Sequence, residues 1–215
     1  MSKKIMVAGG TAEFFEHPRD FVTLGAIHEF IQATPREILE ICARYLSGLK
    51  QPSKRGEFLD SLDRGTWAAR EWLSVLRFHP EVKEGLRPAE YHNLVPNVLK
   101  FALANLVSGT SITPTLKANY YALGTNATAP AAADVKLGTE VLRQLFTNRF
   151  AEANTAYLNV YFPNSAVAGQ TFLEAAIFVD GGSSADTGYP LSLVSINQSV
   201  AALNTLTANA SFSIN

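Results

Sequence analysis

The chain has 215 residues, which is long enough for one large domain or two small ones. A content of 47% hydrophobic and 17% charged residues is typical of a folded protein and excludes extended disorder. The net charge of −1 argues against a general nucleic-acid or anionic-membrane binder, because either would need a basic surface.

Targeting signals are not evident in the sequence. No apolar run reaches the roughly 18 residues that a transmembrane helix needs. The run after Lys3 and Lys4 is too short for a signal peptide. We therefore expect a protein that is made and kept, or assembled, in a cytosol. The single cysteine, Cys42, excludes an internal disulfide bond.

The composition changes near residue 100. Residues 1–100 hold 14 of the 18 Lys and Arg and 13 of the 19 Asp and Glu, whereas residues 101–215 are rich in Ala, Thr, Ser, Asn and Val. This shift predicts two domains. We place a helical module at 1–88 and a helix followed by a β-rich attachment domain at 89–215.

The first predicted helix covers residues 21–32, with Asp20 as its cap and an apolar face at helical spacing. A stronger signal follows at Thr34-Pro35-Arg36-Glu37, which is a capping box with proline at the first helical position. This second helix is expected to end at Ser47-Gly48, with Gly48 in a left-handed cap.

Three further helices complete the helical prediction. After a polar loop at 51–56, a short helix is expected at 58–63. Thr66 is expected to cap the next helix, which runs to Leu76, with one of Trp67 and Trp72 in the core and the other partly exposed. A nearly uncharged helix at 94–107 is predicted to be largely buried against the β-rich part.

After Gly109 the hydrophobic period changes from 3.6 to 2, which predicts strands. The last of them alternates apolar residues with Thr, Asn and Ser, as in an antiparallel sheet with one wet face. Together the segments predict an α+β protein with an antiparallel β-sandwich. The expected strands are 116–122, 141–150, 157–162, 172–179, 191–196 and 206–214.

Four patterns were considered for chemistry. His28-Glu29 lacks the second histidine of a metalloprotease helix, and Gly9-Gly10-Thr11 lacks the ending of a phosphate-binding loop. Cys42 lies on an apolar helix face, which is typical of a core cysteine. Asp180-Gly181-Gly182 to Asp186 is either a Ca²⁺ loop or a hairpin turn, and we favour the turn.

Charged residues are rare in the β-rich half, so Glu140, Arg143 and Glu174 stand out. Arg143 and Glu174 can pair across the sheet, or one of them can cap a backbone turn. We interpret all three as structural residues rather than catalytic ones, because a glycosidase would need two carboxylates in a cleft.

These residues occur in an ordered series of motifs over residues 90–215. The series runs from Ala122-Leu123-Gly124-Thr125, through a small-residue loop and Leu137-Gly138-Thr139-Glu140-Val141-Leu142-Arg143, to a strand that ends in an Asp-Gly turn. It resembles the tail-collar fibre family of tailed bacteriophages, whose domain docks fibres onto the virion. The matching positions are Ala122, Leu123, Gly124, Leu137, Glu140, Val141, Arg143, Glu174, Phe178, Asp180 and Gly181.

The resemblance implies a structural subunit of the tail, baseplate or neck, located in a virion assembled in the host cytoplasm. It implies other virion proteins and further copies of the chain as partners. From the charge and the residue patterns above, we expect no nucleic acid or membrane partner, no cofactor or metal, and no enzymatic activity. Two alternatives are a receptor- or carbohydrate-binding module of the virion and a capsid-surface fibre or decoration protein. Five tyrosines were considered as stacking faces for a glycan: Tyr120, Tyr121, Tyr157, Tyr161 and Tyr189. An enzyme carried by the helical module is a further alternative, without supporting residues.

Overall fold

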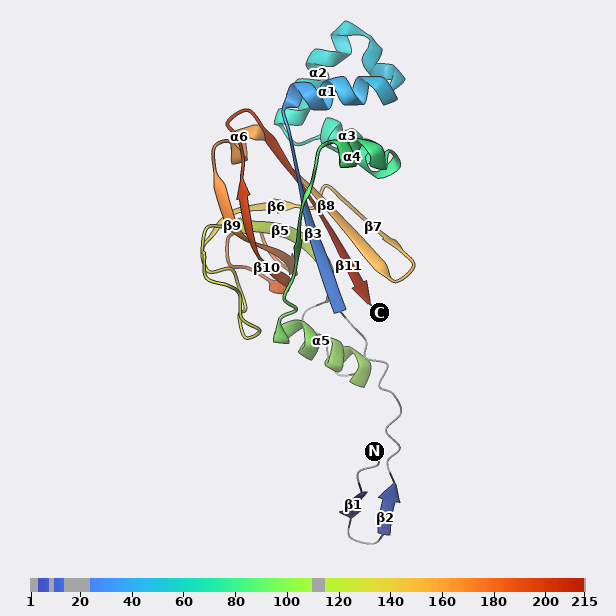
Figure 1. The fold of residues 1–215 in the computed structure, drawn as a ribbon, viewed down its shortest axis with the longest axis vertical. Coiled ribbons are helices and arrows are strands. Elements are labelled where there is room, and N and C mark those ends of the chain that lie inside the picture. The colour runs from blue at the N-terminus through green and yellow to red at the C-terminus, as the bar shows by residue number, and fades with distance from the viewer. Residues whose placement is uncertain (1–3, 8–9, 14–23, 110–114, 215) are drawn as a thin grey trace.

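The structure, a computed structural model, describes residues 4–7, 10–13, 24–109 and 115–214. It is an α+β protein with two antiparallel sheets, which confirms the predicted class (Figure 1). Near the N-terminus, β1 (Lys4–Val7) pairs antiparallel with β2 (Gly10–Glu13). The motif at Gly9 lies partly outside the described residues.

The five-stranded sheet has the order β4-β3-β11-β8-β7. Its strands in that order are Ala89–His92, Leu24–Ala33, Thr205–Ile214, Thr155–Phe162 and Asn148–Glu152. The four-stranded sheet has the order β10-β9-β5-β6. Its strands are Tyr189–Ser199, Thr171–Val179, Ala118–Gly124 and Glu140–Leu145.

Both sheets contribute inward-facing side chains to the main hydrophobic core. Phe30, Val160 and Phe162 come from the five-stranded sheet, and Leu123 and Ile177 come from the four-stranded sheet. All five side chains are at most 2% exposed. The core therefore joins the two sheets.

The strand predictions at 157–162, 172–179, 191–196 and 206–214 are confirmed, with longer bounds at each. The predicted strand at 141–150 is wrong, because this segment forms β6 and β7 in different sheets. Between them, Phe146 donates its backbone N–H to Asn119 O at 3.2 Å, and Thr147 donates to Asn159 O at 2.8 Å. These bonds reach opposite sheets, so the chain crosses from one sheet to the other here.

The helix predicted at 21–32 is also wrong, because Leu24–Ala33 is the strand β3. Its whole length pairs with β11, from Ala33 opposite Thr205 to Leu24 opposite Ile214. One face of β3 enters the main core, and the other packs Ile31 and Ala33 under the helices. Burial on both faces removed the two-residue alternation that would have identified a strand.

Between β3 and β4 lie the helices α1 (Pro35–Tyr45), α2 (Pro52–Asp63), α3 (Trp67–Phe78) and α4 (Pro80–Gly85), with a 3-10 turn at Ser47–Lys50. The capping box is confirmed: Thr34 Oγ1 accepts from Glu37 N at 3.1 Å, and Thr34 N donates to Glu37 Oε2 at 2.7 Å. As predicted, Trp72 is buried and Trp67 is 43% exposed.

Three details of the helical prediction are wrong. The side chain of Thr66 does not cap α3 and donates to Ser61 O at 3.1 Å instead. The polar loop expected at 51–56 belongs to α2, since Pro52 takes a first-turn position, where proline is favourable. The left-handed cap expected at Gly48 is absent, because α1 ends at an extended Leu46 and Gly48 lies in the 3-10 turn.

The helices α1–α4 lie beyond one end of the sheets in Figure 1 and pack on the five-stranded sheet. Trp72 Nε1 of α3 donates to Thr207 Oγ1 of β11 at 3.0 Å, and Lys83 of α4 pairs with Glu29 of β3. Strand β3 lies in the helical module expected at 1–88, and β11 lies in the attachment domain expected at 89–215. Their pairing therefore joins the two expected domains in one sheet.

Helix α5 (Asn97–Ser108) lies at the opposite end of the molecule from α1–α4 (Figure 1). It ends at Gly109 in the left-handed conformation, with φ of 71°, as the Ser108-Gly109 pair predicts. The prediction that this helix is largely buried is wrong. Leu99 and Ala102 are buried, but Phe101 is 65% exposed and Val107 is 87% exposed. A short helix, α6 (Asn164–Val167), follows β8.

Candidate functional site

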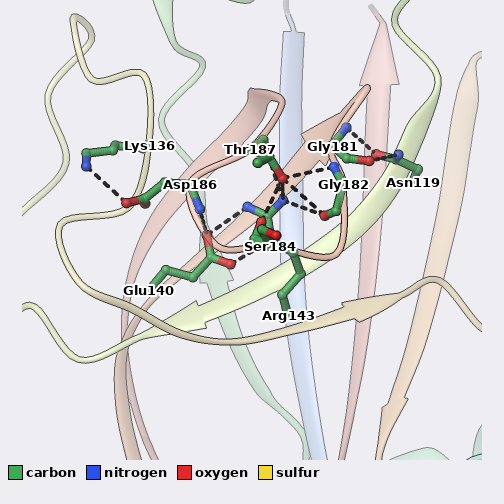
Figure 2. Close-up of polar contacts among 9 residues, drawn as sticks. All are labelled: Asn119, Lys136, Glu140, Arg143, Gly181, Gly182, Ser184, Asp186 and Thr187. Atoms are coloured by element: carbon green, nitrogen blue, oxygen red, sulfur yellow. Dashed lines mark hydrogen bonds and ion pairs between the residues drawn. The ribbon is translucent and has the colours of Figure 1, made fainter.

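The motif residues gather on the outer face of the four-stranded sheet, beneath the loops 125–139 and 180–188. We call Glu140, Arg143 and Glu174, with the loop groups they bind, the outer-face clasp. Strand β6 supplies Glu140 and Arg143, and β9 supplies Glu174. Figure 2 shows Glu140 and Arg143 directed toward the loop that carries Asp186 and Thr187.

Arg143 bonds to groups within the protein through all three guanidinium nitrogens. Its Nε and Nη2 donate to the two carboxylate oxygens of Glu140 at 2.6 and 2.7 Å. The side chain of Arg143 is 3% exposed and that of Glu140 is 1% exposed. Its Nη1 donates to Thr187 O at 2.7 Å and Gly182 O at 3.1 Å. The guanidinium carbon also lies 4.4 Å from the centre of the Phe178 ring. Arg143 therefore fixes the 180–188 loop on the sheet.

Glu174 performs the corresponding role for the other loop. One carboxylate oxygen accepts from Thr139 N at 2.7 Å and from Asn126 N at 3.2 Å, and the other accepts from Gly138 N at 2.8 Å. Glu174 is only 6% exposed, so these backbone donors replace its hydration. Of the two alternatives from the sequence, capping of a backbone turn is confirmed. Pairing of Glu174 with Arg143 is wrong, because Glu140 occupies the guanidinium.

Gly124 is required by the closeness of this carboxylate. A Cβ at Gly124 would lie 2.3 Å from Glu174 Oε1 and 2.5 Å from Thr139 O. Gly181 has a similar role beside Arg143, whose Nη1 would lie 2.9 Å from an added Cβ. These two motif glycines permit close approach of the backbone to the charged side chains.

Asp180 begins the connection between β9 and β10, as the turn interpretation predicts. Its carboxylate accepts from Thr115 N at 2.6 Å and from Thr115 Oγ1. Asp186 instead pairs with Lys136 at 3.1 Å (Figure 2). In the described part of the chain, no group of three His, Cys, Asp or Glu side chains is arranged to hold a metal ion.

The remaining motif residues divide between core and surface. Ala122, Leu123, Leu137 and Phe178 are at most 2% exposed, and all but Leu123 form a small hydrophobic cluster under the loops. Val141 is 48% exposed and lies outside that cluster. The structure thus brings nine of the eleven motif positions to the clasp, its loops or the small cluster beneath them. Leu123 points instead into the core between the sheets, and Val141 lies at the surface.

A second polar cluster lies between the sheets. His28 of β3 contacts Tyr121 Oη of β5 through Nδ1 and Ser192 Oγ of β10 through Nε2, each at 2.7 Å. All three residues are 0% exposed. Burial lowers the pKa of His28 to about 3, so the ring is neutral and serves as both donor and acceptor. We call this the inter-sheet network.

The sequence places His28 on the apolar face of the helix predicted at 21–32 and gives it no polar partner, and it does not single out Ser192. The missed signal is a histidine inside the apolar run Ala26-Ile27-His28-Glu29-Phe30, and a serine between Leu191 and Leu193. A buried polar side chain needs a hydrogen-bond partner. For His28 one such partner is Ser192, which is also a polar residue in an apolar segment.

Other candidates have structural explanations. Cys42 is 0% exposed, and burial raises the pKa of its thiol to about 12, which suppresses the nucleophilic thiolate. His79 and His92 lie beside Glu81 and Glu90 near the surface, and His17 lies outside the described residues.

The five tyrosines do not form a common stacking surface. Tyr121 and Tyr161 are at most 1% exposed, so neither offers a free ring face. Tyr120 packs near Arg143, and Tyr189 is 37% exposed on β10. Tyr157, on β8, stacks on Phe150 and belongs to a different face of the molecule.

Chemically, the outer-face clasp is suited to holding two loops in place. Its guanidinium and both carboxylates are bonded to protein groups. Comparison with protein-family models, with curated proteins and with solved structures found no match for this chain. Within the described ranges, no helix is long and apolar enough to cross a membrane.

Proposed function

We propose that this protein is a structural subunit of a tailed-phage virion, in the tail, baseplate or neck. The two sheets act together as an attachment sandwich, and the helices α1–α4 contact a neighbouring virion protein or a second copy of the chain. The subunit docks virion components by surface complementarity and performs no catalytic turnover.

The observation that carries the proposal is the use of the motif residues in the outer-face clasp. Glu140, Arg143 and Glu174, which carry the resemblance to tail-collar fibre proteins, all saturate their charges on loop backbone or on one another. Such residues preserve the shape of a surface, which is the requirement for docking. A catalytic group would instead keep an atom available to substrate.

Exposed apolar side chains support a partner at the α5 end. Phe101, Leu106 and Val107 are 65%, 48% and 87% exposed on one helix that carries a single charge, Lys100. An exposed helix with apolar side chains and almost no charge is typical of protein contact sites. In a symmetric particle, repetition of modest contacts gives a stable assembly.

Quantitative mass spectrometry of density-purified particles, from a lysate that contains this protein, tests the proposal. We expect a fixed ratio to the major capsid protein. About 3, 6 or 12 copies per particle indicate the tail or neck, whereas hundreds would indicate a capsid-surface fibre or decoration protein. Recovery only in the soluble fraction would overturn the virion assignment.

A further inference from the structure

A cleft of about 490 Å³ lies between the helices α3–α4 and the strands β7, β8 and β11. This volume falls within the range of about 300–1,000 Å³ that is common for small-molecule sites. The cleft lies where the helical cover of the five-stranded sheet ends. Thr207 of β11 is buried beneath Trp72, but Asn209, two residues further along, is partly exposed and lines the cleft.

A row of polar side chains crosses the floor of the cleft. Asn159 of β8 is opposite Asn209 of β11, which is opposite Glu29 of β3. Asn159 Nδ2 donates to Asn209 Oδ1 at 2.9 Å, and Asn209 Nδ2 donates to Glu29 Oε1 at 3.2 Å. Among the described residues, no donor contacts Asn159 Oδ1. The row therefore presents oriented amide groups with hydrogen-bonding capacity toward the cleft.

Aromatic rings form the adjacent wall. Phe150 and Tyr157 are opposite one another on β7 and β8 and stack with centroids 4.9 Å apart and planes at 15°. The Arg77 guanidinium lies 3.6 Å from the centre of the Phe150 ring. The residue opposite Tyr157 on β11 is Ser211, which is too small to cover an aromatic ring. Phe78 adds a ring that is 66% exposed.

The charges around the cleft are balanced. Arg77 and Lys83 supply two cations, and Glu152 and Glu29 supply two carboxylates. Lys83 and Glu29 already pair with each other at 2.5 Å. No surplus of positive charge remains to favour a phosphate or an acidic polymer, so an uncharged ligand is the better fit.

We propose that this cleft binds a short neutral saccharide. A sugar has apolar C–H faces that pack on aromatic rings and hydroxyl groups that both donate to and accept from amides and carboxylates. The stacked Tyr157 provides the first kind of surface, and Asn159 with Asn209 provides the second. This site is independent of the virion role proposed above and uses none of the residues of the outer-face clasp.

The test is a screen of the full-length protein on an array that displays both neutral and acidic glycans. The best neutral hit is then titrated as a free saccharide by isothermal calorimetry. We expect at least one neutral glycan to bind. Tyr157→Ala and Asn159→Ala are each expected to weaken binding at least about tenfold, because each removes one of the two kinds of contact.

Tyr189→Ala is the matched control, since it removes a partly exposed tyrosine from β10, away from the cleft, and should leave the affinity unchanged. Phe78→Ser is a further cleft variant at an exposed position, where folding is little affected, and it should also weaken binding. Circular dichroism and urea unfolding establish that each variant is folded. The proposal is overturned if no neutral glycan binds, if only acidic glycans bind, or if Phe78→Ser and the folded cleft variants retain full affinity.

Discussion

The outer-face clasp and the inter-sheet network are both buried polar clusters, but they differ in charge and in span. The clasp uses the charged residues Glu140, Arg143 and Glu174, whose partners lie mostly on loop backbone. The network uses neutral side chains, and His28 reaches Tyr121 and Ser192 across 93 and 164 residues of sequence. Buried charge requires a complete set of partners, whereas a neutral ring needs only two well-placed bonds.

The largest expected effect tests the charged cluster, the outer-face clasp. Arg143→Ala leaves the Glu140 carboxylate buried without its cation and frees the 180–188 loop. We expect a loss of about 3–5 kcal/mol in the free energy of unfolding, measured by urea denaturation. The control Lys136→Ala breaks the exposed pair with Asp186 and should change stability by less than about 0.5 kcal/mol. A loss below about 1 kcal/mol for Arg143→Ala would show that the contacts of Arg143 with Glu140 and the 180–188 loop contribute little to stability.

The second prediction concerns pH and the neutral network. The pKa of His28 is about 3 in the folded protein and about 6.5 in an unfolded chain. Between these values the unfolded chain binds a proton that the folded protein excludes, so stability falls as pH falls. The expected contribution is about 1.4 kcal/mol per pH unit, or roughly 3 kcal/mol between pH 6.5 and 4.

His28→Gln isolates this contribution, because glutamine can hydrogen-bond but does not titrate. Urea unfolding of both proteins from pH 7.5 to 4 should show a steeper decline for the natural protein below pH 6.5 and parallel curves above pH 7. Parallel curves over the whole range would mean that His28 is hydrated, and the contrast between the two clusters would then disappear.

Glu174→Gln sharpens the comparison within the clasp. The substitution keeps the size of the side chain but removes the charge that three backbone N–H groups share, and its own NH2 group opposes at least one of them. We expect a loss of about 2 kcal/mol in the free energy of unfolding. Glu57→Gln, at an exposed helical position, is the matched control. Equal stability of the two variants would contradict a role for the Glu174 charge.

The smallest expected effect concerns the capping box of α1, whose two partners, Thr34 and Glu37, are three residues apart in the sequence. Thr34→Ala removes the capping box of α1 and should cost about 1 kcal/mol, measured by urea unfolding. The backbone N–H of Thr34, which contributes most, and its hydroxyl both lower the pKa of Glu37. The variant keeps the N–H and loses the hydroxyl, so this pKa should rise part of the way toward its usual value, as measured by NMR titration. Glu40→Ala, in an exposed pair with Arg36, should be nearly neutral.

Local and alternating patterns were readable from the sequence. The capping box at Thr34 and the alternating strand at 206–214 were predicted because their determinants lie within a few neighbouring residues. The rarity of charge in that half of the chain singled out Glu174 as a structural residue, but it left open whether Glu174 pairs with Arg143 or one of the two caps a turn. Its donors at Gly138 and Thr139 did not follow, because the fold of the loop selects them.

Features that depend on distant segments were not predictable in the same way. Leu24–Ala33 resembles a helix in sequence because α1–α4 cover its outer face and the core covers its inner face. The partners of His28 lie on two other strands of the second sheet, so only the sheet packing identifies them. The low charge of helix α5 predicted that the helix is buried. An apolar helix can, however, be covered by its own chain or by a partner molecule, and the sequence does not distinguish the two.

The pairing of β3 with β11 has a consequence for synthesis. Thr205 and Ala33 are bonded although 172 residues separate them. On the ribosome, β3 is made long before β11 and lacks this neighbour in the middle of the sheet until β11 has been made. During that time β3 and β8 each present an unsatisfied strand edge, and such edges are prone to mispairing. The five-stranded sheet therefore cannot complete its folding until β11 has been made, and nascent chains of this protein should depend on chaperones until then.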